Sequence, residues 1–178
     1  LIPRPETEGV VDHVLAELDR GAADPDRASG AAAVVVDLGT GSGAIGLAVA
    51  SERAGTEVHL VDRDEEALRV ARANLAGIGV AGATVRVHSG HWYDALPSDL
   101  AGRVDVVVAN PPYVAETDPL PVEVARWEPR GALVSGPTGL EDVEVIVAAA
   151  PAWLAAGGAL VVEIGETQGD AVVARAEA

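Results

Sequence analysis

The residues with the clearest chemical potential are Asn110, Pro111, Pro112 and Tyr113, which directly follow an uninterrupted run of apolar residues rich in valine. The Asn110 amide offers an acceptor oxygen, and Pro111 supplies a carbonyl with no N–H of its own to compete. These two oxygens could accept both hydrogens of a planar –NH2 group. Two successive prolines also leave Asn110 and Tyr113 little conformational freedom, which preorganises the segment. The motif therefore predicts a site that grips an amino or amide nitrogen.

A second candidate is the glycine-rich stretch Asp37–Gly43, with the sequence DLGTGSG, which lies between an apolar run and a helical pattern. Gly39, Gly41 and Gly43 let the backbone turn tightly and let a ligand approach the amides at a helix N-terminus. Gly41, Gly43 and Gly46 also satisfy the Gly-x-Gly-x-x-Gly dinucleotide spacing, so the loop alone indicates either NAD or S-adenosylmethionine. A tight turn without any ligand is the remaining interpretation.

Asp62 ends the next apolar run, about twenty residues after the glycines, where an acidic side chain can accept both hydroxyls of a ribose. Asp64 is the better helix cap, which leaves Asp62 available for a nucleoside. Asp37 precedes the glycines and could meet a cationic ammonium or organise the loop amides. Together these carboxylates and glycines predict a ribose-bearing cofactor.

The elements that must position these residues are five apolar runs alternating with helical patterns, which predicts an open parallel sheet in an α/β fold. The predicted strands span 31–39, 56–64, 83–90, 103–111 and 158–166. The predicted helices span 5–18, 42–55, 64–77, 140–158 and 167–178, with irregular segments at 19–30 and 111–139. In the expected strand order, 3-2-1-4-5, ligands bind outside the carboxyl ends where the order reverses, so Asn110 should face the glycine loop.

The composition favours one globular domain that binds no nucleic acid. The formal net charge is −16 and all twelve basic residues are scattered arginines, which disfavours a phosphate-binding surface and favours a cationic ligand or a basic protein partner. The absence of cysteine excludes a disulfide framework and a thiolate metal site. The four histidines lack metal-ligand spacing, so no metal is predicted. No apolar run approaches ~18 residues, so we expect no membrane span and a cytoplasmic protein.

Four stretches in a fixed order narrow the interpretation: LIPRPETE at 1–8, NPPYV at 110–114, EPRGAL at 128–133 and GPTGL at 136–140. Together with DLGTGSG and Asp62, they resemble the HemK/PrmC family of protein-(glutamine-N5) methyltransferases, which act on peptide chain release factors in translation termination. The resemblance covers nearly the whole chain and implies a Rossmann-like, S-adenosylmethionine-dependent methyltransferase fold. Asn-Pro-Pro-Tyr alone is shared with adenine-N6 DNA methyltransferases, so the opening octamer and EPRGAL carry the distinction.

The resemblance also implies a role for each candidate residue. Asn110, Pro111 and Tyr113 are the expected catalytic residues, because Asn110 and the Pro111 carbonyl would hold the glutamine amide while Tyr113 packs its plane, and Pro112 completes the substrate site. Trp92 matches a position that packs beside adenine, with ordinary core packing as the alternative. The expected cofactor-binding set is Asp37, Gly39, Thr40, Gly41, Ser42, Gly43, Asp62, Trp92 and Asn110. The product would be S-adenosyl-L-homocysteine, and the partner a class 1 peptide chain release factor with a Gly-Gly-Gln loop.

Two departures from that family are expected. The family normally carries an N-terminal helical domain and a final antiparallel β-hairpin, whereas residues 1–178 are expected to form the catalytic domain alone, with a leading helix and loop at 1–30. The chain would then be a fragment of a longer protein. Without the hairpin, the fifth strand should form a hydrophobic edge of the sheet.

Three alternatives remain from the residues alone. An adenine-N6 nucleic-acid methyltransferase would need a flipped base and a basic groove. A nicotinamide oxidoreductase would explain the glycines and Asp62 but would leave Asn-Pro-Pro-Tyr without a role. A truncated domain would bind the cofactor without turnover.

Overall fold

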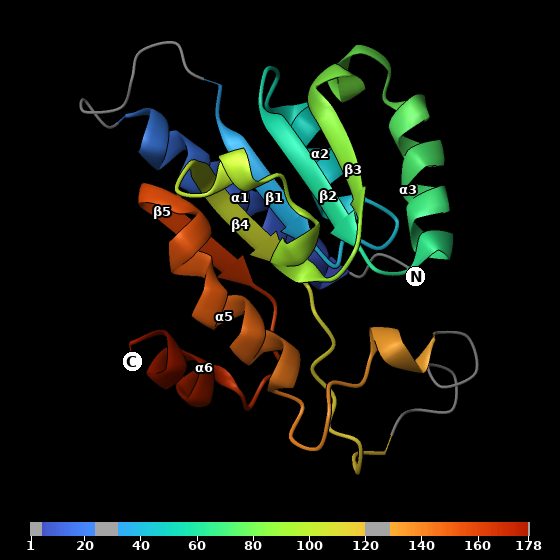
Figure 1. Cartoon of the computed structure of the whole chain (residues 1–178), viewed down its shortest axis with the longest axis vertical. Coiled ribbons are helices and arrows are strands. Elements are labelled where there is room, and N and C mark those ends of the chain that lie inside the picture. The colour runs from blue at the N-terminus through green and yellow to red at the C-terminus, as the bar shows by residue number, and fades with distance from the viewer. Residues whose placement is uncertain (1–4, 24–31, 120–128, 178) are drawn as a thin grey trace.

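The computed structural model describes residues 5–23, 32–119 and 129–177. Within these residues, five strands form one parallel sheet in the order β3-β2-β1-β4-β5 (Figure 1), which confirms the predicted topology. The strands are β1 Val34–Leu38, β2 Glu57–Asp62, β3 Val85–Ser89, β4 Val104–Ala109 and β5 Leu154–Val162. Strand β1 pairs with β2 on one side and β4 on the other, so the order reverses beside β1.

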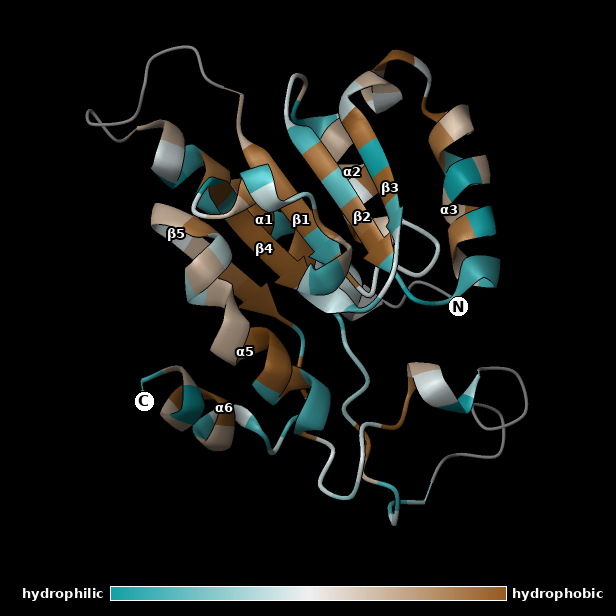
Figure 2. Ribbon diagram, viewed as in Figure 1, coloured by the Kyte–Doolittle hydropathy of each residue, from teal (hydrophilic) through white to brown (hydrophobic). Residues whose placement is uncertain are grey.

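The central strands are buried on both faces, which explains why their sequences are apolar without alternation. Successive side chains still point to opposite sides, so Val35 and Val106 belong to the core on one face, whereas Val36 and Val107 belong to the core on the other. Figure 2 shows β1 and β4 as mostly hydrophobic strands, and each contains a single aspartate, Asp37 in β1 and Asp105 in β4. The sheet therefore forms the middle layer of a three-layer fold.

Helices cover both faces of the sheet (Figure 1). The helices are α1 Pro5–Ala22, α2 Ala44–Glu52, α3 Glu65–Gly77, α5 Glu141–Trp153 and α6 Gly169–Ala176. Helices α1, α2 and α3 contribute to one core, and α5 contributes to the other together with the 3-10 turn Trp92–Ala95. Helix α6 packs against α5. This arrangement leaves the carboxyl ends of the strands open.

Helix α3 forms as predicted because its sequence supplies its own start signal. The Asp64 side chain accepts a hydrogen bond from the Glu66 amide at 2.9 Å, which confirms Asp64 as the N-cap. Acidic Glu65 and Glu66 lie in the first turn, where their negative charges interact favourably with the positive end of the helix dipole. Helix α2 begins directly after the glycine loop, with Gly43 as its N-cap.

The fifth strand differs most from the expectation. It spans Leu154–Val162 instead of 158–166, because the helix before it ends at Trp153 rather than continuing to 158. Pro151 lies in the last turn of α5 and has no N–H to donate, and the helix ends two residues later.

The early start of β5 is accommodated by an irregularity in its pairing with β4. Val104 pairs with Leu154, and Val106 pairs with Ala159, so the register shifts between the two pairs. Gly157 lies within this shift at φ 76°, a left-handed conformation that glycine adopts without strain. Regular pairing then continues to the end of both strands.

The remaining boundaries differ less. Helix α1 extends to Ala22, so the first residues of the predicted 19–30 loop are helical, while residues 24–31 lie outside the described part of the chain. As predicted, β5 ends the sheet at one edge, with β4 as its neighbour.

Candidate functional site

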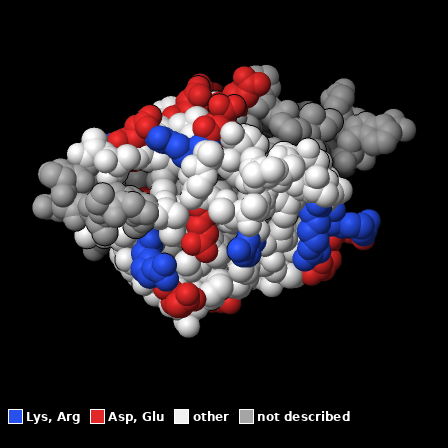
Figure 3. Space-filling view, turned by 90° about the horizontal axis from the view of Figure 1, so that it is seen from above, with Lys and Arg blue, Asp and Glu red and all other residues white. Residues whose placement is uncertain are grey.

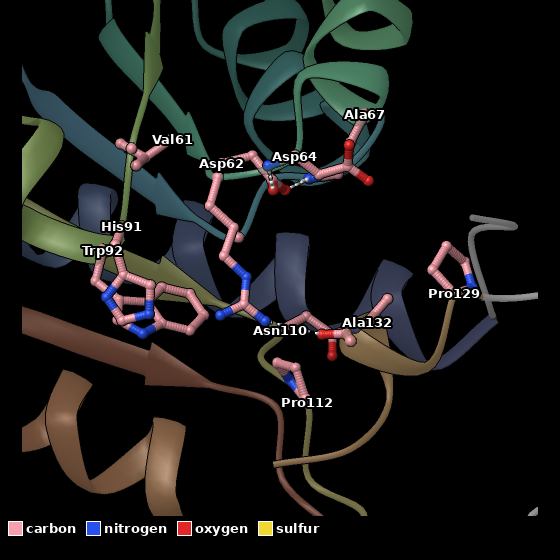
Figure 4. Close-up of a pocket in the computed structure, with 15 residues that line it drawn as sticks. Val61, Asp62, Asp64, Ala67, His91, Trp92, Asn110, Pro112, Pro129 and Ala132 are labelled. Atoms are coloured by element: carbon pink, nitrogen blue, oxygen red, sulfur yellow. Dashed lines mark hydrogen bonds between the residues drawn. The ribbon is translucent and has the colours of Figure 1, made fainter. Parts of the chain in front are cut away.

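A pocket opens at the carboxyl ends of the strands, beside the point where the strand order reverses. Each of four strands leads into its wall: Gly39 and Gly41 after β1, Asp62 at the end of β2, Trp92 after β3, and Asn110 and Pro112 after β4. Figure 4 shows Asp62, Trp92 and Asn110 around one space. Open α/β sheets bind ligands at this position, so the pocket is the candidate functional site.

The glycine loop reaches the pocket because its backbone adopts left-handed conformations. Gly39 and Gly41 have φ values of 69° and 57°, which side chains rarely permit. A Cβ atom on Gly39 would lie 3.0 Å from the Trp92 ring, so the backbone approaches the indole here more closely than a residue with a side chain would readily permit. The Thr40 amide donates to the Val61 carbonyl at 2.9 Å, which ties the loop to the end of β2.

Asp37, in the strand that precedes the glycine loop, helps to hold the loop in place. Its carboxyl is buried, and Oδ2 accepts hydrogen bonds from the Thr40 hydroxyl at 2.6 Å and the Gly46 amide at 2.9 Å. A Cβ atom on Gly46 would lie 3.0 Å from that oxygen and still closer to Leu60, so only glycine permits this approach of α2 to the sheet. Burial raises the Asp37 pKa to about 6, against the lowering effect of the hydrogen bonds. Of the two roles predicted for Asp37, these contacts agree with the organisation of the loop.

Asp62 faces the pocket with both carboxylate oxygens oriented by the backbone. Oδ2 accepts from the Gly41 amide at 2.8 Å, and Oδ1 accepts from the Asp64 amide at 2.9 Å (Figure 4). Because each carboxylate oxygen can accept more than one hydrogen bond, acceptor capacity remains for a hydroxyl of a bound molecule. The geometry is compatible with the ribose contact predicted from the sequence.

Trp92 serves both as core and as pocket wall. It belongs to the apolar cluster on the α5 face, and its ring also lines the pocket beside Gly39. Its backbone has φ 44°, which is uncommon for a large side chain. The buried indole Nε1 has no hydrogen-bond partner among the described residues. His91 lies next to it, with ring centroids 5.3 Å apart, and lines the same pocket.

Asn110 stands at the end of β4 with its amide held in one orientation. Its Nδ2 donates to Glu163 Oε2 at 2.8 Å. Further along, the Tyr113 carbonyl accepts from Gln168 Nε2 at 3.0 Å, so both ends of the Asn-Pro-Pro-Tyr motif contact the segment after β5. Gln168 Nε2 also donates to the Gly139 carbonyl at 3.1 Å.

Glu163 and Gln168 are absent from the sequence-based set, although a signal for Glu163 existed. In the order 4-5, the residue after β5 must lie beside the residue after β4. Ala109 pairs with Val162, which brings Glu163 next to Asn110. The strand predicted at 158–166 placed Glu163 inside the strand, so the boundary error concealed this neighbour.

Residues from 129–132 form a further part of the pocket wall. Pro129, Gly131 and Ala132 line the pocket, and the Gly131 carbonyl accepts from Arg63 Nη2 at 3.3 Å. At the base of this segment, Val114 and Val134 form an isolated parallel bridge. The Val114 amide donates to the Leu133 carbonyl, and the Val114 carbonyl accepts from the Ser135 amide, both at 2.9 Å.

Several predicted residues support the pocket without lining it. The Ser42 carbonyl accepts from Asn74 Nδ2 at 2.9 Å, which anchors the glycine loop to α3. Pro111 is buried and Tyr113 is half-buried. The predicted residues outside the lining are Asp37, Thr40, Ser42, Gly43, Pro111 and Tyr113. Glu128, the first residue of EPRGAL, lies outside the described residues.

Within residues 5–23, 32–119 and 129–177, no helix is both long and apolar enough to cross a membrane. The same residues contain no group of three or more histidine, cysteine or acidic side chains arranged to hold a metal ion.

Curated relatives resemble nearly all of this chain. It is 44% identical over 173 residues to release factor glutamine methyltransferase of Xylella fastidiosa, and 46% identical over 176 residues to that of Burkholderia pseudomallei. It is 38% identical over 173 residues to that of Escherichia coli. These alignments cover 97% of this chain but only 57–58% of each relative. The chain therefore spans less than two thirds of the length of the relatives it matches.

Solved structures share the fold at lower identity. Ribosomal protein L11 methylase of Lactobacillus delbrueckii matches with a TM-score of 0.61 and 17% identity, over 97% of this chain and 67% of that one. Precorrin-6y C5,15-methyltransferase of Geobacter metallireducens matches with a TM-score of 0.59 and 16% identity, over 99% and 72%. The strand order and the pocket thus belong to a Rossmann-like methyltransferase fold. Residues 25–125, more than half of the sequence, match the family profile, and the chain belongs to the methyltransferase small domain family.

Proposed function

We propose that the chain transfers a methyl group from S-adenosylmethionine to the side-chain amide nitrogen of a glutamine in a peptide chain release factor. The observation that carries this proposal is the position of Asn110, in the wall of a pocket that also includes the glycine loop and Asp62. Relatives with 38–46% identity that are named release factor glutamine methyltransferases support the choice of substrate.

The cofactor half of the pocket fits an adenosyl group attached to a charged amino-acid portion. The loop from Gly39 to Gly43 would lie against the methionine portion, because left-handed glycines let a ligand approach the backbone without meeting side chains. Asp62 and Trp92 line the pocket, where Asp62 would accept hydrogen bonds from the ribose hydroxyls and the Trp92 indole would pack beside the adenine. Asp37, Thr40 and Ser42 act indirectly, by holding the loop in shape.

The substrate half must activate a poor nucleophile, because the lone pair of an amide nitrogen is conjugated into its carbonyl. S-adenosylmethionine supplies a methyl group made electrophilic by the attached sulfonium. Asn110 Oδ1 and the Pro111 carbonyl would accept hydrogen bonds from the two N–H groups of the glutamine amide and orient its nitrogen toward the methyl carbon. Both acceptors favour the pyramidal transition state over the planar ground state, so orientation replaces a strong base. As the N–C bond forms, the S–C bond of the sulfonium would break and leave S-adenosyl-L-homocysteine, and the methylated nitrogen would release one proton to water. Tyr113 packs against the plane of the amide.

The partner in this proposal is a class 1 release factor that presents the glutamine of a Gly-Gly-Gln loop. With a net charge of −16, the chain favours encounter with a basic protein surface. The proposal also puts the protein in the cytoplasm, where release factors act.

The test combines cofactor binding with methyl transfer. Calorimetry with S-adenosylmethionine and with NAD should give binding of the first and not the second. Labelled methyl groups should then reach a release-factor domain, and a matched domain whose loop glutamine is replaced by alanine should remain unlabelled. NAD binding in place of S-adenosylmethionine would contradict the cofactor assignment. Methylation of an adenine-containing oligonucleotide, with the release-factor domain left unmodified, would contradict the substrate assignment.

A further inference from the structure

The Asn110 amide is held from behind by a carboxylate. Asn110 Nδ2 donates to Glu163 Oε2 at 2.8 Å in a partly buried position. An ionised carboxylate has acceptor atoms only, so the atom that faces it must be the amide nitrogen. Because the amide group is planar, the Asn110 carbonyl oxygen is directed to the other side.

The orientation matters because an asparagine amide can turn over at little steric cost. Its oxygen and its NH2 group are similar in size, and the terminal torsion has two nearly equivalent positions. In the turned position, Asn110 would offer N–H groups to a substrate –NH2, and donor would then meet donor. An acceptor site for an amide nitrogen therefore requires a neighbour that selects one of the two positions.

Strand pairing puts Glu163 where it can make this selection. Ala109 pairs with Val162, and the Glu163 amide donates to the Ala109 carbonyl at 3.0 Å, so the ladder continues one residue past both strands. Asn110 and Glu163 are thus the first residues after two neighbouring parallel strands, at matching positions. Their contact is set by the pairing of β4 with β5, which suits a residue that must fix an angle.

Gln168 secures the same segment at a second point. Its Oε1 accepts from the Gly165 amide at 2.9 Å, while its Nε2 donates to the Tyr113 carbonyl at 3.0 Å. The chain after β5 therefore contacts the Asn-Pro-Pro-Tyr motif at its first and last residues. The bond at Asn110 is the one that orients a side chain of the pocket.

We infer that Glu163 is a positioning residue that keeps Asn110 Oδ1 directed toward the nitrogen that receives the methyl group. The inference rests on the proposed function. The negative charge also polarises the Asn110 amide through the hydrogen bond, which makes Oδ1 a stronger acceptor. No proton is transferred and no bond is broken in this role. It makes Glu163 the determinant of whether the pocket presents an acceptor or a donor.

The first experiment reads the Asn110 orientation without any activity. The sequence contains only Asn74, Asn110 and Gln168 as side-chain amides, so an NMR spectrum of the isotope-labelled chain resolves three –NH2 pairs. Replacement of Glu163 by alanine should shift the Asn110 pair and speed its hydrogen exchange. The Asn74 pair, which donates to the Ser42 carbonyl, is the internal control and should stay in place. An unchanged Asn110 pair would overturn the inference.

The second experiment separates positioning from folding by kinetics. Glu163→Ala should lower kcat by about 10- to 100-fold, because a misaligned acceptor loses orientation, while the S-adenosylmethionine Kd stays within about twofold. Glu163→Gln keeps an acceptor oxygen and should recover most of the lost kcat. Glu166→Gln removes an exposed carboxylate three residues later and should match the wild type.

The outcomes of the two arms distinguish the inference from the function on which it rests. A Glu163→Ala chain with wild-type kcat, or a Glu163→Gln chain no better than the alanine variant, would overturn the positioning role. A purely structural role would lower the melting temperature and the cofactor affinity of Glu163→Ala together and leave kcat per folded chain unchanged, which would also overturn it. If the wild-type chain methylates no release factor, the proposed function fails, and the NMR arm still decides whether Glu163 orients Asn110.

Discussion

Among single residues, Asn110 offers a test that distinguishes substrate handling from cofactor binding. Its carbonyl oxygen is the proposed acceptor, whereas the cofactor contacts proposed for Asp62 and the glycines are independent of it. Asn110→Ala should therefore remove most turnover and change the S-adenosylmethionine Kd by less than about tenfold, or about 1.4 kcal/mol. Single-turnover methyl transfer and calorimetry on the same preparation measure the two quantities. Equal losses in both would identify Asn110 mainly as a cofactor ligand.

Gly39 offers a sharper test of the cofactor wall, since the chain contains a matched control. An alanine at 39 would be strained at φ 69° and would bring its Cβ within 3.0 Å of the Trp92 ring. Gly55 has φ 85°, but a Cβ there would meet nothing within 4 Å. Both variants should lose about 1–2 kcal/mol of folding stability from the backbone conformation. Only Gly39→Ala should also weaken S-adenosylmethionine binding, by roughly tenfold. Equal S-adenosylmethionine affinities in the two variants would contradict the assignment of Gly39 and Trp92 to the wall of the cofactor pocket.

Asp37 makes stability depend on pH. Its pKa is raised from 3.8 to about 6, chiefly by burial, so the folded state binds a proton more tightly than the unfolded state. The stabilising contribution is complete below pH 3.8 and is lost as pH rises through 6. Asp37→Asn carries no such charge. The free energy of unfolding of this variant, measured relative to that of the wild type, should therefore rise by about 1.5 kcal/mol from pH 5 to pH 8. Urea denaturation at both pH values measures the gap, and a constant gap would argue against a buried, titrating Asp37.

At the scale of elements, the sequence predicted the sheet better than its last strand. The runs that became β1 and β4 contain valines on both faces, and this pattern matches central parallel strands whatever packs around them. The Asp64 cap was equally local and was predicted correctly. The start of β5 depends on Pro151 together with a bulge against β4, and the bulge exists only in the paired sheet.

The same distinction explains which parts of the site could be anticipated. Motif glycines, Asp62 and Asn110 lie at strand ends and could be assigned from the order of elements alone. Glu163 was missed, because its role appears only once the register of β4 and β5 is known to one residue, and the predicted fifth strand ended at 166 instead of Val162. The resemblance to known methyltransferases marked EPRGAL, and the structure adds that Pro129, Gly131 and Ala132 line the pocket.

The bulge in β5 leads to a prediction about the pairing of β5 with β4. A Cβ atom on Gly158 would lie 2.9 Å from the Val104 carbonyl and 3.1 Å from the Asp105 carbonyl, and backbone oxygens in a sheet cannot move aside. Gly158→Ala should therefore cost about 1–3 kcal/mol in the free energy of unfolding. Gly169→Ala is the control, because a Cβ there meets nothing within 4 Å and should be neutral or stabilising. Chemical denaturation of both variants tests the contrast, and equal stability would mean that the bulge relaxes freely.

At the scale of the whole molecule, charge is the dominant feature. Most described arginines pair with a neighbouring carboxylate, as Arg20 does with Glu17 at 2.6 Å and Arg175 with Glu144 at 2.6 Å. On the face shown in Figure 3, the basic side chains are separated from one another, with acidic groups among them. This distribution offers no continuous basic track over that face, which weakens the case for nucleic acid as the substrate.

Unbalanced negative charge should make the fold sensitive to salt. With a net charge of −16, self-repulsion opposes compaction, and added ions screen it. Raising sodium chloride from low to moderate concentration at pH 8 should increase the melting temperature by about 2–4 °C, equivalent to about 1 kcal/mol. Near the isoelectric point of about 4.4 the same addition should have little effect. A salt response of equal size at both pH values would show that general ion effects, rather than net charge, control stability.

The small bridge between Val114 and Val134 bears on how such a domain could acquire new substrates. Its two backbone hydrogen bonds join the chain just after the transfer site to the chain just before α5. Whatever stretch connects them begins and ends at one fixed junction, and doubling the length of a flexible connection costs only about 0.6 kcal/mol in closure entropy. The connecting stretch is thus a natural cassette. Evolution or a protein engineer can vary it, provided that Pro129, Gly131 and Ala132 keep their places in the pocket wall, while the residues proposed to perform the transfer stay where they are.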